Sequence, residues 1–100
     1  MPDIVTSKNG KSIRLTDERW AHIVEEHNEL AGRRYDVIEA VADPTRILAG
    51  NEGEHLAVHE VETGKWLVAV YREEANDGFV ITAFLTRRIR ALDKRRQLWP

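Results

Sequence analysis

The chain has 100 residues, of which 42% are hydrophobic and 32% charged, and its net charge is −2 at pH 7. The absence of Cys excludes disulfides and thiolate metal sites. The N-terminus lacks the apolar core of a signal peptide, and no window approaches ~18 apolar residues. We therefore expect a single cytoplasmic domain over residues 1–100 that does not associate with a membrane.

The N-terminal part predicts a short strand followed by a helix. The strand covers residues 11–15, after the turn signal Asn9-Gly10. Thr16 has the position and side chain of a helix N-cap, and two carboxylates follow it, where they oppose the helix dipole. The helix is expected to run to about residue 27 or 30, because one apolar stripe recurs at helical spacing: Trp20, Ile23, Val24 and His27.

A second helix and four strands follow. The helix is expected from Tyr35 to Ala42, because Asp43-Pro44 ends it. The strands are expected at residues 46–49, 55–62, 65–72 and 78–85, and the middle two form a hairpin around Thr63-Gly64. This β-α-α-β-β-β-β order predicts an α+β fold, in which two N-terminal helices pack on one face of a four-stranded antiparallel sheet.

The last predicted strand leads from the core directly into a charged segment. Its side chains alternate between an apolar face and a mixed face: Phe79, Ile81, Ala83 and Leu85 on the first, Val80, Thr82, Phe84 and Thr86 on the second. The mixed face continues into Arg87 and Arg88 and suits a phosphate-bearing ligand, although Thr is also a good strand residue. The expected register adds Tyr71 to this mixed face and leaves the face of Trp66 and Ile81 to the helices.

The C-terminal segment, residues 87–100, is basic on a chain that is acidic elsewhere. Residues 87–96 carry six basic side chains and one acid, Asp93. The negative net charge argues against a strong non-specific grip on nucleic acid, whereas this segment suits a phosphate-contacting surface. The alternative is that the segment pairs with the acidic helix surface or with a partner protein.

Several classes of active site are excluded by spacing. On an extended strand His55 and His59 would lie about 13 Å apart, too far to share a metal ion. His22 and His27 point about 140° apart around their helix, so they are not a metal pair either. The sequence has no phosphate-binding Gly-rich loop, dinucleotide fingerprint or Gly-x-Ser-x-Gly motif. We expect no metal and no cofactor.

The remaining His, Arg, Tyr and Thr side chains suit one reaction, the cleavage of RNA by its own 2′-OH. That reaction needs a base, an acid and cations around the phosphorus, and it needs no metal. Each candidate also has a structural interpretation. His27 lies on the apolar stripe and can stabilise the helix end, His22 lies on the polar face, and Tyr71 and Thr82 are good strand residues.

Four segments together resemble the small phage-type nucleases of the barnase–EndoU–colicin–RelE superfamily: RWAHIVEEHNEL, VIEAVADPTRIL, KWLVAVYRE and DGFVITAFLTRRI. The resemblance extends from about Ile13 to Ile89 and rests on His22-Ile23 with His27, on Asp43-Pro44 and on Thr82-Ala83-Phe84-x-Thr86. Asn28 stands where such relatives more often have Pro. The order of elements is also similar to that of RelE-type and BrnT-type ribonuclease toxins.

The resemblance implies a metal-independent endoribonuclease with its site on the sheet. Carried over by position, His22 and His27 would be the acid and base, and Tyr71, Thr82 and Thr86 would orient the phosphate or ribose. Arg87 or Arg46 would hold negative charge, and Arg88 is a further candidate for phosphate binding. The implied partners are RNA and, if the chain is the toxin of a toxin–antitoxin pair, an antitoxin.

Two other functions stay open at this point. The first is a non-catalytic interaction module on the same fold, which docks a protein through the basic C-terminal segment and its Trp99. The second is a small-molecule-binding α+β domain, which would require a deep apolar pocket.

Overall fold

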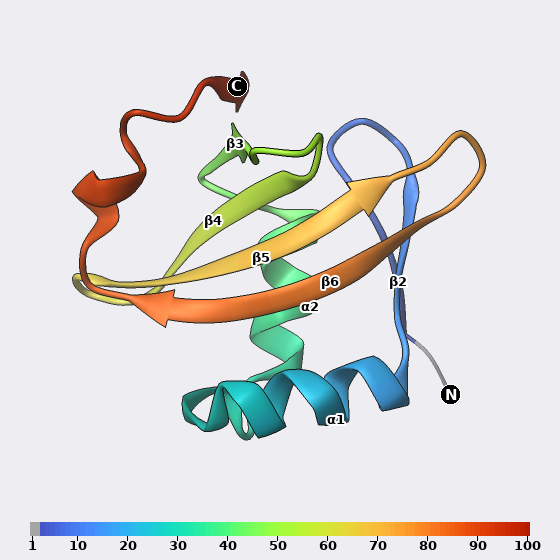
Figure 1. The fold of residues 1–100 in the computed structure, drawn as a ribbon, viewed down its shortest axis with the longest axis horizontal. Coiled ribbons are helices and arrows are strands. Elements are labelled where there is room, and N and C mark those ends of the chain that lie inside the picture. Colours follow the sequence, from blue (N-terminus) through green and yellow to red (C-terminus); the bar gives the residue numbers. More distant parts are fainter. Residues whose placement is uncertain (1–2) are drawn as a thin grey trace.

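The computed structural model describes residues 3–100. Within that range, two α-helices, two short 3₁₀ helices and seven strands follow one another along the chain (Figure 1): β1 (Asp3–Thr6), β2 (Ser12–Leu15), α1 (Asp17–Glu26), η1 (Asn28–Leu30), α2 (Arg34–Ala42), β3 (Arg46–Ala49), β4 (His55–Glu62), β5 (Lys65–Glu73), β6 (Gly78–Thr86), η2 (Ile89–Leu92) and β7 (Gln97–Trp99). The strands form one sheet in the order β1-β2-β6-β5-β4-β3-β7.

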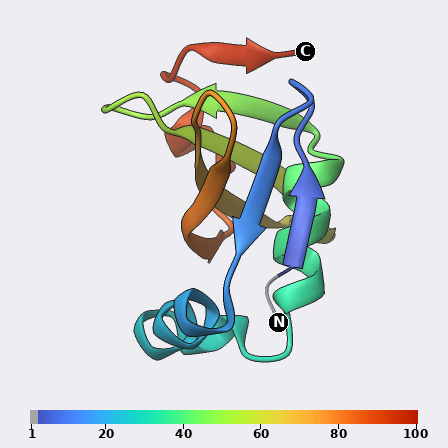
Figure 2. The same ribbon diagram turned by 90° about the vertical axis from the view of Figure 1, so that its right-hand side faces the viewer.

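The fold is of the predicted α+β class, but the predicted four-stranded antiparallel sheet is wrong. The sheet has seven strands and is mixed, because β2 pairs with β6 in parallel while the other pairs are antiparallel. The additional strands β1 and β7 have only four and three residues, too few to show an alternating pattern. They lie at the two edges of the sheet, and Figure 2 shows β1 beside β2.

The first helix begins as predicted. The Thr16 hydroxyl accepts a hydrogen bond from the Arg19 backbone N–H at 3.0 Å, so it satisfies one of the donors left unpaired at a helix start. The helix ends at Glu26, and His27 is its C-cap residue. No helix in the described range is long and apolar enough to cross a membrane.

The main core lies between the helices and one face of the sheet. Ile23 of α1 and Val37 and Val41 of α2 are fully buried against Leu67 and Tyr71 of β5. Figure 1 shows α1 running along β6, while α2 packs against β1, β4 and β5. Burial of these apolar side chains supplies most of the stability of such a fold.

Two bulges invert the register that the sequence predicts. Between Glu60 and Glu62 the β4–β5 ladder shifts, so that His59 pairs with Leu67. A second shift between Val70 and Tyr71 leaves Ile81 of β6 without a partner in the ladder. An extra residue in one strand moves the following side chains to the other face. The helices cover the face of the sheet that carries Tyr71. The prediction that they cover the face that carries Trp66 is therefore wrong.

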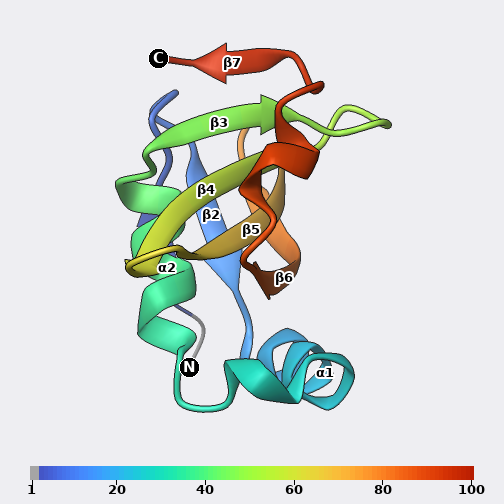
Figure 3. The same ribbon diagram turned by 90° about the vertical axis from the view of Figure 1, so that its left-hand side faces the viewer.

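The opposite face of the sheet, which we call the helix-free face, is covered in part by the C-terminal segment. Ile89 and Leu92 pack there on a second apolar cluster: Leu48, Leu56, Val58 and Val68 with Trp66, Val70 and Phe84. In Figure 3, α2 lies on one side of β4 and β5 and the red C-terminal segment on the other. We call residues 87–100 the strap.

The end of the strap is part of the sheet. Trp99 is half-buried and pairs with Ile47 of β3, and the Lys8 ammonium lies 5.0 Å from the centre of its ring. Trp99 is therefore part of the edge of the sheet and not a fully exposed side chain.

Gly78 is the position where β6 comes closest to its neighbours. A Cβ added there would lie 2.6 Å from the Arg72 carbonyl oxygen and 2.6 Å from Ile13 Cδ1. Because the carbonyl belongs to the backbone, we expect Gly78→Ala to force β5 and β6 apart and to lower the free energy of unfolding by about 2 kcal/mol. Urea unfolding followed by circular dichroism measures this change. An unchanged unfolding midpoint would show that β5 and β6 move apart at this point without a loss of stability.

Candidate functional site

The two predicted acid–base histidines lie on α1 but in different surroundings. His22 is exposed, and its Nε2 lies 2.9 Å from Glu26 Oε1. His27 is half-buried at the end of the helix, where its backbone N–H donates to the Ile23 carbonyl at 2.8 Å and its Nδ1 lies 3.7 Å from Glu29 Oε2. At a helix C-terminus a protonated imidazole also meets the negative end of the dipole.

Tyr71 lies in the core and not on a surface of the molecule. Its side chain is fully buried under the helices, and its hydroxyl has no hydrogen-bond partner among residues 3–100. Burial, with a smaller contribution from Glu73, raises the pKa of Tyr71 well above that of an exposed tyrosine. The phenol stays protonated and inaccessible, so the predicted role in orienting phosphate or ribose has no geometric basis. The bulge between β5 and β6 places Tyr71 and Thr82 on opposite faces of the sheet, so the two side chains do not share a surface.

Tyr71 belongs instead to a buried polar cluster that joins β5 to the β1–β2 turn. Its ring stacks on His55 with 5.2 Å between centroids, and His55 Nε2 lies 3.7 Å from Glu73 Oε1. Glu73 accepts hydrogen bonds from the Ser7 hydroxyl at 2.5 Å and from Asn9 Nδ2 at 3.0 Å. His55 therefore has a structural environment rather than a catalytic one.

Thr82 and Thr86 lie on the helix-free face, together with Phe84. Val70 pairs with Thr82 and Trp66 with Thr86, on the face away from Tyr71. The Thr86 hydroxyl accepts a hydrogen bond from the Arg88 backbone N–H at 3.0 Å, which fixes the turn that leaves the sheet. These threonines thus remain on a surface, as predicted.

The predicted site residues gather only in part. Because η1 contacts β6, the end of α1 lies beside the strand, and Figure 1 shows both elements ending at the same side of the molecule. The C-terminal end of α1, where His27 is the cap residue, and the end of β6, which Thr86 closes, thus lie at the same side of the molecule. Tyr71 lies in the core, and Arg46 lies on β3, where its Nη2 is 2.9 Å from Asp93 Oδ1. His22 and Thr82 make no hydrogen bond or ion pair with the others in the described range.

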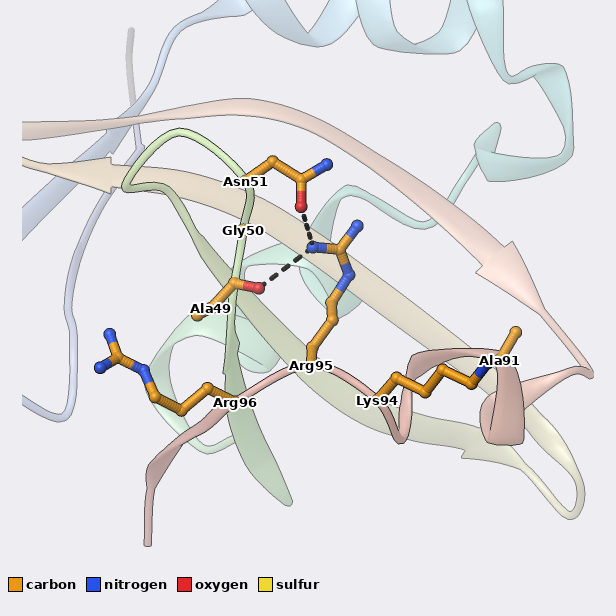
Figure 4. A pocket seen from close by; sticks show the side chains of 7 residues that line it. All are labelled: Ala49, Gly50, Asn51, Ala91, Lys94, Arg95 and Arg96. Atoms are coloured by element: carbon orange, nitrogen blue, oxygen red, sulfur yellow. Dashed lines mark hydrogen bonds between the residues drawn. The ribbon is translucent and has the colours of Figure 1, made fainter.

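Two hollows on the helix-free side were not predicted. The basic hollow, of about 580 Å³, lies between the loop after β3 and the strap, and its lining includes Asn51, Lys94, Arg95 and Arg96 (Figure 4). The apolar hollow, of about 320 Å³, adjoins it and includes Glu54, Leu56, Val70, Phe84 and Leu92. The only sequence signal for them was the basic run of residues 87–96, because Asn51 and Glu54 reach the strap only through the fold.

Glu54 is one of two acidic residues, with Glu52, that line the apolar hollow. Backbone N–H groups of the loop, that of Glu52 first, lower the pKa of its carboxyl, and the guanidinium groups of Arg72 and Arg95 contribute in the same direction. Its Oε1 accepts from the Glu52 N–H at 2.8 Å. Glu54 is thus ionised at neutral pH, and it presents a hydrogen-bond acceptor at the edge of the apolar hollow.

Among residues 3–100, no group of three or more potential metal-ligating side chains is close enough to hold an ion. Comparison with family models, with curated proteins and with solved structures found no match to this chain.

Proposed function

We propose that this chain binds RNA along the strap and the helix-free face of its sheet, and that it cleaves this RNA as a metal-independent endoribonuclease. One observation carries the proposal. The side chains of four strap cations, Arg88, Arg90, Lys94 and Arg96, make no hydrogen bond or ion pair with any residue in the range 3–100. Cations left without partners in this range, next to half-buried threonines and aromatic rings, suit a phosphodiester chain.

The negative net charge is compatible with this surface because the charges are separated. Four of the ten residues of α1 are acidic, whereas the strap holds six basic side chains and one acid. Of the strap charges, Asp93 is paired with Arg46 on β3. A local positive surface on an acidic protein attracts a polyanion and orients it as it approaches.

The proposed chemistry uses the end of the sheet where α1 meets β6. The 2′-oxygen attacks phosphorus as it loses its proton, the bond from phosphorus to the 5′-oxygen breaks, a water molecule protonates the leaving 5′-oxygen, and a 2′,3′-cyclic phosphate remains. His27 is the proposed base for the 2′-OH proton, because it is half-buried at the end of α1, and this end lies at the same side of the molecule as the end of β6. Arg87 and Arg88 follow β6 directly in the chain. The two guanidinium groups would stabilise the charge that develops on the phosphate oxygens.

An RNA substrate implies a cytoplasmic location. It also implies competition with any acidic protein partner, such as an antitoxin, for the same strap cations. A partner of this kind would neutralise the surface instead of being cleaved, so it would act as an inhibitor.

The test uses a fluorescent single-stranded RNA with EDTA at pH 5 to 8, and gel analysis of product ends. We expect cleavage with cyclic phosphate ends, and a loss of about 100-fold or more for His27→Gln. His22→Gln is the matched control, since it removes an exposed imidazole from the same helix and is expected to keep most of the activity. Absence of cleavage throughout this pH range, with RNA binding retained, would reduce the proposal to RNA binding alone. Absence of binding as well would end it.

A further inference from the structure

Arg95 is held in place by one edge of its guanidinium and leaves the other edge open. Its Nη1 donates to the Ala49 carbonyl at 3.2 Å and to Asn51 Oδ1 at 3.0 Å (Figure 4). Its Nε and Nη2 make no hydrogen bond with any residue in the range 3–100. Two parallel donors on a fixed guanidinium are the geometry that binds a phosphate through two hydrogen bonds.

The apolar hollow next to Arg95 offers a flat hydrophobic wall. Phe84 and Leu92 line it together with Val70, and all three belong to or pack on the second apolar cluster. A nucleobase stacks on such an aromatic ring with little dependence on its identity. Ionised Glu54 adds one acceptor for a base N–H.

The two hollows adjoin, because Gly50, Asn51 and Arg95 line both. A ligand with an aromatic part and an adjacent anionic part therefore occupies both at once. Lys94 and Arg96 both line the basic hollow, and neither side chain has a hydrogen bond or ion pair within residues 3–100. In Figure 4 the two side chains extend away from each other, with Arg95 between them. The pair of hollows thus matches a planar base joined to one phosphate.

We propose that these hollows form a subsite for a single nucleotide, with its base against Phe84 and its phosphate on Arg95 and Lys94. The inference rests on the proposed function, since it assigns one nucleotide of the bound RNA to this part of the strap. It is separate from the cleavage chemistry, which lies at His27.

The subsite is formed before any ligand binds. Arg46 and Asp93 join β3 to the strap at 2.9 Å, and the Ala49 N–H donates to the Arg96 carbonyl at 2.8 Å. Because these contacts fix the strap against β3, binding does not need to order it, and the affinity loses little to conformational entropy.

The experiment titrates the whole protein with AMP, GMP, CMP and UMP, and separately with inorganic phosphate and adenosine, followed by NMR of the backbone amides. We expect the nucleotides to bind about tenfold or more tightly than phosphate or adenosine alone, with shifts around Asn51, Phe84 and Arg95. Equal binding of inorganic phosphate would show a simple anion site and overturn the proposal, as would the absence of nucleotide binding.

Two variants test the two halves of the subsite. Phe84→Leu keeps an apolar side chain but removes the ring, and it is expected to weaken AMP binding about tenfold. Lys94→Glu reverses an exposed charge and is expected to weaken AMP binding to a similar degree. If Phe84→Leu fails to fold, Lys94→Glu still tests the subsite. Arg19→Glu is the matched control, because it makes the same charge change at an exposed residue of α1 outside both hollows and is expected to keep AMP affinity within about twofold. An equal loss of affinity in the control would overturn the subsite.

RNA assays separate this inference from the proposed function. If wild-type protein binds or cleaves RNA, and Phe84→Leu and Lys94→Glu do so equally well, the subsite is wrong and the function stands. If AMP binds at these residues but RNA is neither bound nor cleaved, the proposed function is wrong and so is the assignment of this subsite to RNA.

Discussion

Removal of residues 93–100 is expected to lower the free energy of unfolding by about 3 kcal/mol. The deletion exposes the edge of β3, where Ile47 and Leu48 are each only 1% exposed in the intact chain. It also removes the Arg46–Asp93 ion pair and the Arg95 hydrogen bonds to the loop after β3. For a domain of this size the melting temperature should fall by roughly 15 °C.

Thermal and urea unfolding followed by circular dichroism measure this loss. Leu98→Ser is the control, since its side chain is 40% exposed in the same strand and its loss should cost less than about 0.5 kcal/mol. An unchanged melting temperature after the deletion would show that β7 contributes no stability. If the expected loss is found, a failure of the truncated chain to bind a partner reflects a damaged sheet as much as a missing docking site.

The helices and the longer strands could be predicted because their signals are local. The Thr16 cap, the apolar stripe of α1 and the stop at Asp43-Pro44 each act within a few residues. The edge strands could not, since β1 and β7 become strands only by pairing with β2 and β3. The intrinsic strand propensity has little influence in such short segments, and tertiary contacts decide whether they become strands.

The register failed for a different reason. Val80 and Ile81 are both apolar, so the alternation in β6 does not say which of them faces the core. The bulge resolves this by burying Val80, which is 1% exposed, and by leaving Ile81 unpaired in the ladder. The simple alternation therefore placed the side chains from Phe79 to Ile81 on the wrong faces of the sheet. It also placed Tyr71 on the surface, although the structure buries it.

The candidate site was predictable only where it lies within one segment. The run from Thr82 to Arg88 belongs to one strand and its exit, so the threonines and arginines stay together in the fold. The hollows around Arg95 combine the strap with a loop some 40 residues earlier, and Asn51 to Arg95 is a separation of 44 residues. No local pattern encodes that contact.

The second large effect concerns Tyr71, where two substitutions are expected to differ sharply. Tyr71→Ala removes a fully buried ring and should cost about 4 kcal/mol. Tyr71→Phe keeps the ring and removes a buried hydroxyl that has no partner among residues 3–100, so stability should stay equal or rise by up to about 1 kcal/mol. Urea unfolding at pH 7 compares the two, with RNA cleavage by Tyr71→Phe expected to equal that of the wild type.

The pH dependence of stability gives an independent test of the same burial. Since the pKa of Tyr71 is raised in the folded state, the unfolded chain loses this proton first as the pH rises above about 10. The stabilising effect of the neutral phenol is complete below that pH and declines above it, by up to about 1.4 kcal/mol per pH unit. The free energy of unfolding of wild type minus that of Tyr71→Phe should therefore be constant from pH 7 to 9 and fall between pH 10 and 11. A constant difference through pH 11 would mean that the phenol is exposed, and it would return Tyr71 to the surface on which the sequence pattern placed it.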